Sequence, residues 1–470
     1  MRIRTAALAL VVILVSTAWA VWRPDKTMRV VTGFAAHTLC SQTFVSGFDP
    51  DEVFAQTIAP YPGVRLLAGR LDIDVDRARR EVRVDLMGAF AARAVFRDRL
   101  GCLVVAGAGP IEPGLAGQAP ASARLPPEIA GPDVVEPASP ELRAALDHVF
   151  AEPAAPPHRW IKAVVVVKDG RVVAERYAPG VAVDTPLMGY SVSKSIVNAL
   201  VGIMVGQGRL KVEAPAPVAE WGGAGDPRAK ITLDDLLRMT SGLAIAQTGS
   251  GFDPASRMLY TEEDMAAFAQ SAPPLEPPGK AMRYSDASTL IVSRILRDAA
   301  GPSGADIQDF AKRELFAPLG MTSVVMEADA VGTPVGATYF LASARDWARL
   351  GKLYLDDGII GGRRILPEGW AHYSATSTLG TSYGAGFWTN AGGDGDALGR
   401  VLRGGMPCDA FFASGNLGQR VYIMPSDRLV IVRMGVTQQP DYDIAGDLRL
   451  IREALAAFGG PRTQACAAKN

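Results

Sequence analysis

Ser191 and Lys194 stand three residues apart at the start of a mostly apolar stretch, and their types and spacing could do chemistry. In a helix, positions i and i+3 share a face, so the ammonium would lie beside the hydroxyl if the helix begins at Ser191. A serine is a poor nucleophile at neutral pH, but a lysine that loses its proton in apolar surroundings can act as its base. The spacing therefore predicts a serine acyl-transfer enzyme that needs no histidine.

The Ser-x-x-Lys pattern alone is weak evidence, because chance produces it in chains of this composition. It occurs once in this chain, and the apolar residues between 196 and 205 cover most of the helix circumference, which is typical of a buried helix. A charged lysine is rarely tolerated there without a task or a partner. The alternative is a lysine that reaches solvent at the start of the helix.

The composition is that of an ordinary globular protein of two or three domains. The chain has 470 residues, of which 48% are hydrophobic and 21% charged, and its net charge is -1. That balance gives no reason to expect nucleic acid as a partner. The sequence has no Cys/His cluster of the metal-binding type, so we expect no metal and no cofactor. The expected partner is a small-molecule acyl substrate.

Residues 1–24 have the pattern of a signal peptide. Arg2 and Arg4 precede an apolar run at 6–15, and Ala18-Trp19-Ala20 has the small-x-small form of a cleavage site. We therefore expect an exported, periplasmic protein. The apolar stretch extends far enough that an uncleaved inner-membrane anchor through residues 5–22 is the alternative.

Four cysteines in an exported chain suggest two disulfides, which three pairings would allow. We expect Cys40 with Cys102 and Cys408 with Cys466, because each bridge then stays inside one domain. Four buried free thiols are the alternative for a cytosolic protein.

Changes in composition and residue pattern divide the rest of the chain into three parts and a C-terminal tail. Residues 25–107 read as a small α+β module with a helix at 50–58 and strands at 71–75 and 81–86. Residues 108–140 are so rich in Pro, Ala and Gly that a packed core is not expected there, and we interpret them as a linker. The largest domain is expected at 141–462, with a C-terminal tail at 463–470.

Within residues 141–462 we expect strands at both ends and helices between them. Asp169-Gly170 joins two branched runs and predicts a hairpin, and Thr232 with Asp235 predicts a helix cap. This order favours an α+β fold, in which one antiparallel sheet from both ends packs against a helical region. The strands are expected at 163–167, 171–177, 384–389, 419–424 and 429–435, and the helices at 142–150, 232–239, 287–299, 307–314, 344–354 and 444–458, after the helix of Ser191.

An ordered set of motifs resembles a known family. The set comprises SVSK (191–194), ITLDDLLRMTSGL (231–243), PPGKAMRYSDAS (277–288), LFAPLGM (315–321), ARDWARLGKLYLDDG (344–358) and GQRVYIMPSDRLVIV (418–432). Between about 150 and 460 the chain is similar to the beta-lactamase-related serine hydrolases, and most similar to class C beta-lactamase-like esterases and 6-aminohexanoate-dimer hydrolases. The resemblance implies a beta-lactamase/transpeptidase-like antiparallel sheet flanked by helices, with an all-helical region.

The resemblance also implies roles for individual residues. Ser191 would be the acylated nucleophile, Lys194 the base, and Tyr284 the proton shuttle of the family's Tyr-x-Asn element. A phenol near a lysine cation is pushed toward phenolate, which suits that shuttle. Asp286 stands where many relatives have asparagine. Its carboxylate should favour a protonated Lys194, which leaves open whether Lys194 or Tyr284 is the main base.

The family's third element, usually Lys-Thr-Gly on an edge strand, corresponds to Ser414-Gly415-Asn416-Leu417-Gly418, within about two residues. The backbone N–H groups of Ser191 and of the strand near Asn416 would form the oxyanion hole, and Gly415 and Gly418 would allow close approach of the acyl group. The stretch lacks a lysine to bind a penicillin carboxylate. We therefore expect poor beta-lactamase activity and an ester, amide or short peptide as substrate.

Two other interpretations need weighing. Gly380-Thr381-Ser382-Tyr383-Gly384 has the form of a nucleophile elbow, but that motif needs a preceding strand, a following helix and a later histidine, and no histidine follows His372. The chain could also be a non-catalytic binding or scaffold protein at the cell envelope. Trp388, Phe411 and Phe412 either line the pocket or pack in the core.

Overall fold

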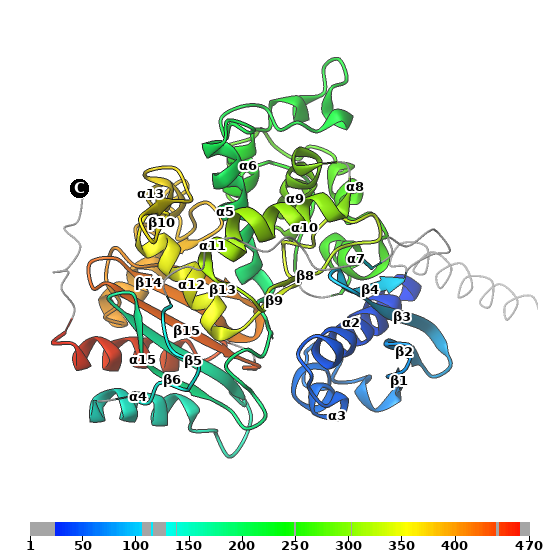
Figure 1. Cartoon of the computed structure of the whole chain (residues 1–470). Helices are drawn as coiled ribbons and strands as arrows, with labels where there is room; N and C mark the ends of the chain where they lie inside the picture. The colour runs from blue at the N-terminus through cyan, green and yellow to red at the C-terminus, as the bar shows by residue number, and fades with distance from the viewer. Residues whose placement is uncertain are drawn as a thin grey trace, which may run out of the picture.

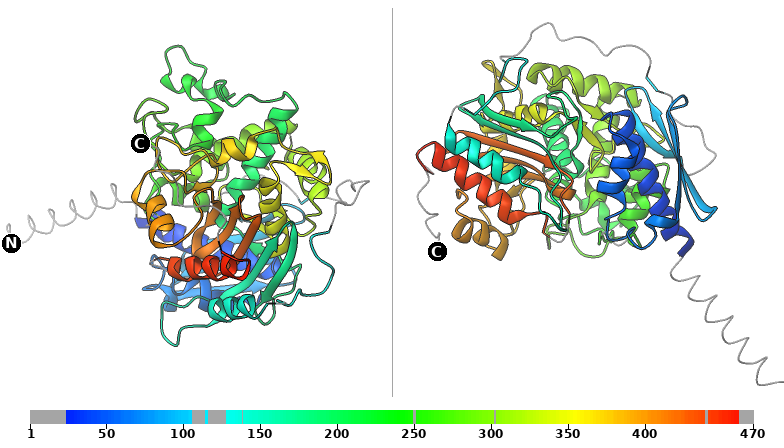
Figure 2. Two further views of the ribbon diagram at one scale, coloured as in Figure 1. Left: turned by 90° about the vertical axis from the view of Figure 1, so that its left-hand side faces the viewer. Right: turned by 90° about the horizontal axis from the view of Figure 1, so that it is seen from below.

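The computed structural model describes residues 24–105, 114–115, 128–137, 139–248, 251–301, 303–438 and 441–460. Figure 1 shows a sheet layered between helices, a mostly helical region above it, and a smaller N-terminal module to the right of the sheet and below the helical region. Seen from below in Figure 2, the N-terminal module (blue) lies on one side of the molecule, and helices α4 (Pro140–Phe150) and α15 (Ile444–Ala457) lie on the other.

The main sheet has six antiparallel strands in the order β12-β13-β14-β15-β5-β6. Strands β15 and β5 come from opposite ends of the domain and pair with Val432 opposite Val165. The expectation of one antiparallel sheet built from both ends is therefore confirmed. The strands are β5 (Ile161–Lys168), β6 (Arg171–Tyr177), β12 (Trp388–Thr389), β13 (Phe411–Gly415), β14 (Gln419–Met424) and β15 (Leu429–Gly435).

The valines of β5 show why the sheet is buried on both faces. Val165 and Val167 belong to one core cluster together with residues of α12 (Ala344–Leu355), whereas Val164 and Val166 belong to a second cluster together with residues of α4 and α15. Successive side chains of a strand point to opposite faces, so a strand covered on both sides needs a continuous apolar run. The AVVVV sequence meets that need.

The hairpin between β5 and β6 turns at Asp169 and Gly170, whose φ angles are 50° and 84°. A two-residue turn with positive φ at both central positions matches the right-handed twist of the paired strands. The expected hairpin is confirmed.

The helical region lies between the two halves of the sheet in sequence. The cap of α6 is a capping box in which Thr232 and Asp235 bond each other's backbone N–H, as expected. Helices α7 and α8 occur in a stretch where the sequence indicated mainly loop. The helices are α5 (Ser193–Gly206), α6 (Leu233–Leu237), α7 (Pro254–Thr261), α8 (Met265–Gln270), α9 (Asp286–Ala300), α10 (Gly304–Ala311), α11 (Ala317–Leu319), α13 (Trp370–Ala375) and α14 (Gly395–Leu398). The short strands are β7 (Leu187–Met188), β8 (Val325–Met326), β9 (Phe340–Ala342), β10 (Ile359–Ile360) and β11 (Arg363–Arg364).

The N-terminal module is a four-stranded antiparallel sheet in sequence order with a long helix packed against it. Cys40 of that helix and Cys102 of the last strand form the expected disulfide, with their Cα atoms 6.0 Å apart. Cys466 lies outside the described residues, as do residues 1–23 and the tail at 463–470, so the expectations for those residues stay predictions. The elements are α2 (Pro24–Phe44), α3 (Pro50–Val53), β1 (Leu71–Asp76), β2 (Glu81–Leu86), β3 (Ala89–Arg97) and β4 (Gly101–Val105).

A buried carboxylate joins this module to the rest of the chain. Glu327 is fully buried, and its Oε1 accepts hydrogen bonds from the Ser41 hydroxyl and the Cys102 backbone N–H, each at 2.8 Å. Its Oε2 lies 3.0 Å from Nε2 of His37. We call Glu327, His37, Ser41 and Cys102 the junction cluster.

Two parts of the fold differ from what the sequence indicated. Helix α2 was not expected, because its buried residues include many polar ones, such as Thr32, His37 and Gln42, and these hide the apolar periodicity. Residues 128–137 were expected in an unpacked linker, but Ile129 and Ala130 are buried and the segment hydrogen-bonds with β6. The prediction of an unpacked segment is therefore wrong for this part. Among the described helices, none combines the length and apolar character that a membrane span requires.

Candidate active site

Ser191 lies in a 3-10 turn, Tyr190–Val192, that leads directly into α5. The residue before it, Tyr190, has a φ of 47°, which is uncommon for a residue other than glycine and marks a strained backbone of the kind found at functional sites. Residues 193 to 204 are buried, whereas Ser191 is only partly buried. The fold therefore leaves this hydroxyl reachable at the start of a buried helix.

Lys194 points its amine at three acceptors. Its Nζ lies 3.0 Å from Ser191 Oγ, 2.8 Å from the Ala337 carbonyl oxygen and 2.5 Å from Asp286 Oδ1. The lysine side chain is 3% exposed and the aspartate side chain 6% exposed. An ammonium has three N–H groups, so a charged Lys194 satisfies all of them here and donates to the serine.

Asp286 begins α9 with its carboxylate at the helix N-terminus, where the helix dipole favours negative charge. Gln247 holds this residue from the other side. The Gln247 amide donates to Asp286 Oδ2 at 3.0 Å, and its carbonyl oxygen accepts the Asp286 backbone N–H at 2.6 Å. The two contacts fix the carboxylate, so that Oδ1 faces Lys194.

Tyr284 lies beside the Lys194 amine, which is 4.8 Å from the centre of the phenol ring. Its ring stacks on Trp388 and meets Tyr383 edge-on, with centroid distances of 5.8 and 5.6 Å. Burial and, after it, the charge of Asp286 raise the pKa of Tyr284, while a hydrogen bond with Ser191 lowers it.

The expectation that a lysine cation pushes Tyr284 toward phenolate is therefore wrong. The sequence could not reveal that burial of the phenol and the nearby Asp286 carboxylate raise the pKa of Tyr284. A Tyr284 that keeps its proton acts as a donor toward Ser191 or toward an atom bound next to it.

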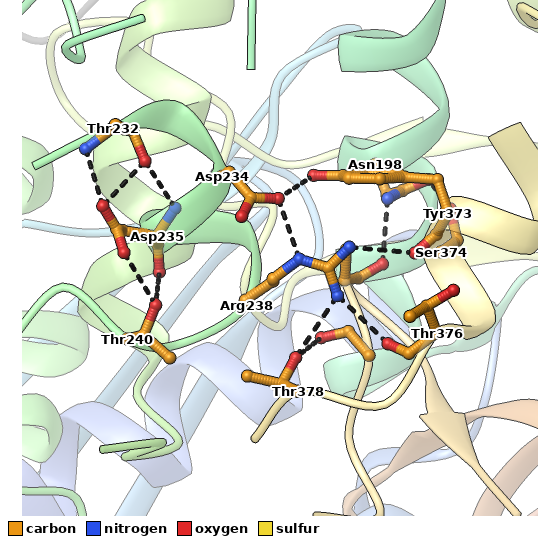
Figure 3. A network of polar contacts seen from close by, with 12 residues as sticks. Asn198, Thr232, Asp234, Asp235, Arg238, Thr240, Tyr373, Ser374, Thr376 and Thr378 are labelled. Atoms are coloured by element: carbon orange, nitrogen blue, oxygen red, sulfur yellow. Dashed lines mark hydrogen bonds and ion pairs between the residues drawn. The ribbon is translucent and has the colours of Figure 1, made fainter. Parts of the chain in front are cut away.

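A network of hydrogen bonds connects α5, α6 and α13 (Figure 3). Asn198, one turn after Lys194, donates to the Ala385 carbonyl at 2.9 Å and accepts from the Trp370 indole at 2.8 Å. Nearby, Arg238 donates to the carbonyls of Tyr373 and Thr376. Buried polar groups that are fully hydrogen-bonded hold one packing arrangement, so α5 and α13 are set rigidly against each other.

The stretch after β13 lies next to the nucleophile, as the third motif requires. A Cβ atom on Gly415 would lie 2.3 Å from the carbonyl oxygen of Gly189, two residues before Ser191. Gly418 has a φ of 84°, and a Cβ there would meet the Arg433 guanidinium at 2.0 Å. Both positions therefore require glycine.

Asn416 turns its side chain away from this backbone, since its Oδ1 accepts from the Tyr442 hydroxyl at 2.7 Å. That the backbone near Asn416 binds an oxyanion stays a prediction.

The aromatic residues separate into two groups. Trp388 is stacked on Tyr284 and belongs to the site, whereas Phe411 and Phe412 are buried in the two core clusters on opposite faces of the sheet. Residues 380–384 form turns without a preceding strand or a following helix, so they are not a nucleophile elbow.

Two polar contributors were missed by the motifs. Gln247 lies in a loop, and Ala337 contributes only its backbone carbonyl, which no side-chain pattern identifies. The distance in sequence between Gln247 and Asp286 follows no recognisable motif, because tertiary packing brings the two segments together.

Comparisons with known proteins identify relatives of this chain. The family model described as Beta-lactamase matches residues 162–456. A 6-aminohexanoate-dimer hydrolase from Paenarthrobacter ureafaciens is 25% identical over 226 residues, which cover 44% of this chain and 55% of that protein. The match therefore spans about half the length of that relative.

Solved structures are similar in fold. A candidate 6-aminohexanoate-dimer hydrolase from Bacillus anthracis has a TM-score of 0.55 and 22% identity, over 73% of this chain and 89% of its own. A class C beta-lactamase from Rhodobacter sphaeroides has a TM-score of 0.50 and 19% identity, over 68% of this chain and all of its own (100%). These likenesses confirm the expected beta-lactamase/transpeptidase-like α+β fold, preceded here by an N-terminal sheet module.

Proposed function

Because the chain belongs to the Beta-lactamase family of serine hydrolases, we propose that it hydrolyses an ester, amide or short peptide-like substrate through an acyl-enzyme on Ser191. The observation that carries this proposal is the 3.0 Å contact between Lys194 Nζ and Ser191 Oγ, formed by a buried amine and the hydroxyl of a partly buried serine. A nucleophile within hydrogen-bond reach of its base, with the base held by a third group, is the arrangement that activates a serine.

The base in this proposal is the pair of Lys194 and Asp286. The pair shares one proton, and its net charge is zero whether the proton lies on Nζ or on the carboxyl group. When the carboxyl group holds it, Nζ has a lone pair that rotation about the Cε–Nζ bond can point at Ser191 Oγ. Moving the proton over 2.5 Å adds no net charge to the buried site.

The chemical steps then balance without another reactant. Ser191 Oγ attacks the substrate carbonyl carbon while its proton passes to Lys194 Nζ. The tetrahedral intermediate expels the alcohol or amine, which receives a proton from Lys194 directly or from the hydroxyl of Tyr284. In the second case Lys194 passes the serine proton to Tyr284, so both groups return to their starting states. Water gives a proton to the same pair and attacks the acyl carbon, and the pair returns that proton to Ser191 Oγ as the acid leaves.

Tyr284 serves as a proton donor in this scheme. Burial and Asp286 raise its pKa, so it enters the reaction protonated. When it gives its proton to the leaving group, the Lys194 ammonium, 4.8 Å from the ring, stabilises the transient phenolate.

We also propose that beta-lactam hydrolysis is inefficient and that the protein works outside the cytoplasm. Strand β13 ends as Ala413-Ser414-Gly415 and offers no cation for a carboxylate next to the scissile bond. The Cys40–Cys102 disulfide suits an oxidising compartment, in keeping with the expected leader at 1–24. Mass spectrometry of the protein from its native cell envelope would test whether the leader is removed and whether the Cys40–Cys102 disulfide is formed.

The decisive test of the hydrolase function is labelling with a fluorophosphonate probe, followed by hydrolysis of p-nitrophenyl acetate and butyrate. We expect wild type to be labelled, and Ser191→Ala to lose the label and nearly all esterase activity. The matched control is Ser193→Ala, because the Ser193 hydroxyl accepts the Phe340 backbone N–H and is fully buried. A folded wild type that neither labels nor hydrolyses any ester would instead favour a non-catalytic binding protein.

A further inference from the structure

A cavity of about 570 Å³ lies where the N-terminal module meets the hydrolase domain. Its size is that of a small-molecule site. One wall consists of residues between Gln56 and Arg65 of the N-terminal module, and the opposite wall includes Pro156, Pro157, Leu417 and Gln438. Neither part of the chain forms this cavity alone.

Leu417 in the cavity wall connects the cavity, along the backbone, to the end of β13 beside the nucleophile turn. Leu417 follows directly after Asn416 and Gly415, and Gly415 packs against the Gly189 carbonyl beside the nucleophile turn. Tyr61 lies in the cavity wall on the side of the N-terminal module.

Arg65 is the single charged residue among the described residues that line this cavity. Its side chain is exposed, and no hydrogen bond or ion pair joins its guanidinium to any described residue. The other lining residues are prolines, a leucine, a tyrosine and neutral polar residues. The cavity is thus largely apolar, with one unpaired cation.

We propose that residues 56–65 form one wall of the substrate site, and that Arg65 binds a carboxylate at the far end of an elongated, otherwise apolar acyl substrate. A guanidinium binds a carboxylate through two parallel hydrogen bonds, and a single cation matches its single negative charge better than the higher charge of a phosphate. The inference rests on the proposed hydrolysis at Ser191, since it assigns the part of the substrate remote from the scissile bond.

This inference changes how the missing lysine of the third motif is understood. In this chain the cation comes from a different module, and it lies away from the scissile bond rather than beside it. An acyl chain with a terminal carboxylate could therefore be bound, although a carboxylate beside the reacting carbonyl could not.

The test uses pairs of p-nitrophenyl esters of dicarboxylic acids of four to ten carbons, each compared with the ester that carries a neutral terminal amide. We expect wild type to favour the carboxylate by about 10-fold or more in kcat/KM at one chain length, mainly through KM. Arg65→Gln should lower this preference by about 10-fold, and Arg65→Lys should lower it less. Arg70→Gln, at an exposed arginine of the same module that does not line the cavity, should keep it.

A second variant tests the wall itself. Gln56→Trp adds bulk to a half-buried side chain that lines the cavity, so it should lower kcat/KM for ten-carbon chains relative to acetate. The inference is overturned if wild type hydrolyses both members of every pair equally, or if Arg65→Gln and Gln56→Trp leave these ratios as they are. Fluorophosphonate labelling reports separately on Ser191. An enzyme that is labelled and active but does not distinguish the terminal carboxylate from the terminal amide would contradict this inference and leave the proposed function intact.

Discussion

Two buried carboxylates in this molecule have similar partners and different surroundings. Asp286 contacts Lys194 at the candidate active site, and Glu327 contacts His37 in the junction cluster. Around Glu327, the histidine, the serine and the carboxylate are all closed off from solvent. Around Asp286, the partner lysine also donates to Ser191, which is only partly buried.

The difference teaches that a buried charged group indicates a function only when one of its contacts remains open. At the junction every partner is internal, so the free energy of these contacts stabilises the attachment of the module. At the site one partner can be reached by a substrate, so the same kind of contacts can prepare a nucleophile. Substitutions at the two places should therefore act on different measurements.

The largest expected effect is that of Lys194→Met at the open site. The variant keeps much of the volume but removes the base, so kcat/KM for p-nitrophenyl butyrate should fall by about 10,000-fold. Circular dichroism should show the wild-type fold. Activity within 10-fold of wild type would show that Lys194 is not the base, and the candidate active site would then not differ in function from the junction cluster.

Glu327→Gln at the closed site should have the converse effect. The amide cannot act as the charged partner of His37, and we expect a loss of about 3 kcal/mol in the free energy of unfolding. The measurement is urea denaturation followed by tryptophan fluorescence. In the absence of urea, where the variant is folded, kcat/KM should remain within about twofold of wild type. A large loss of activity without a loss of stability would contradict the conclusion that the junction cluster acts on stability and not on catalysis.

Asp286→Asn tests whether the open carboxylate takes a proton. The amide preserves the size of the side chain and can still contact Lys194, but it cannot accept the lysine proton, so we expect kcat to fall by about 100-fold. Gln247→Ala is the companion variant, since it frees the carboxylate without neutralising it and should cost less. Equal activity of Asp286→Asn and wild type would show that the carboxylate is dispensable.

The smallest effect concerns pH and a third buried carboxyl group, two residues after Glu327. Burial raises the pKa of Asp329 from 3.8 to about 7 in the folded chain. Between these values the folded state holds the proton and the unfolded state has lost it, so this contribution to stability is complete below about pH 4 and is lost as the pH rises through 7.

Relative to Asp329→Asn, the wild-type free energy of unfolding should therefore decline by about 2 kcal/mol between pH 5 and pH 8. Urea denaturation of both proteins at the two pH values measures the difference. A difference that stays constant, or that grows with pH, would contradict a raised pKa at Asp329.

Much of the fold was predictable from local patterns. The AVVVV run, the Asp169-Gly170 turn and the Thr232–Asp235 cap each depend on nearby residues, and the structure has all three. Helix α2 was not predictable, because its polar residues are buried by contacts with other parts of the chain. The same holds for residues 128–137, whose partners on β6 lie about 40 residues away.

The sequence by itself determined that Ser191 and Lys194 would lie on one face at the start of a helix, because a spacing of three residues has this effect in any helical backbone. Only the tertiary structure decided that Asp286 contacts the amine and Gln247 holds Asp286, that burial raises the pKa of Tyr284, and that Arg65 lines a cavity between the N-terminal module and the rest of the chain. The physical reason is that burial, pairing of charges and the shape of a cavity depend on segments that meet only when the chain has folded.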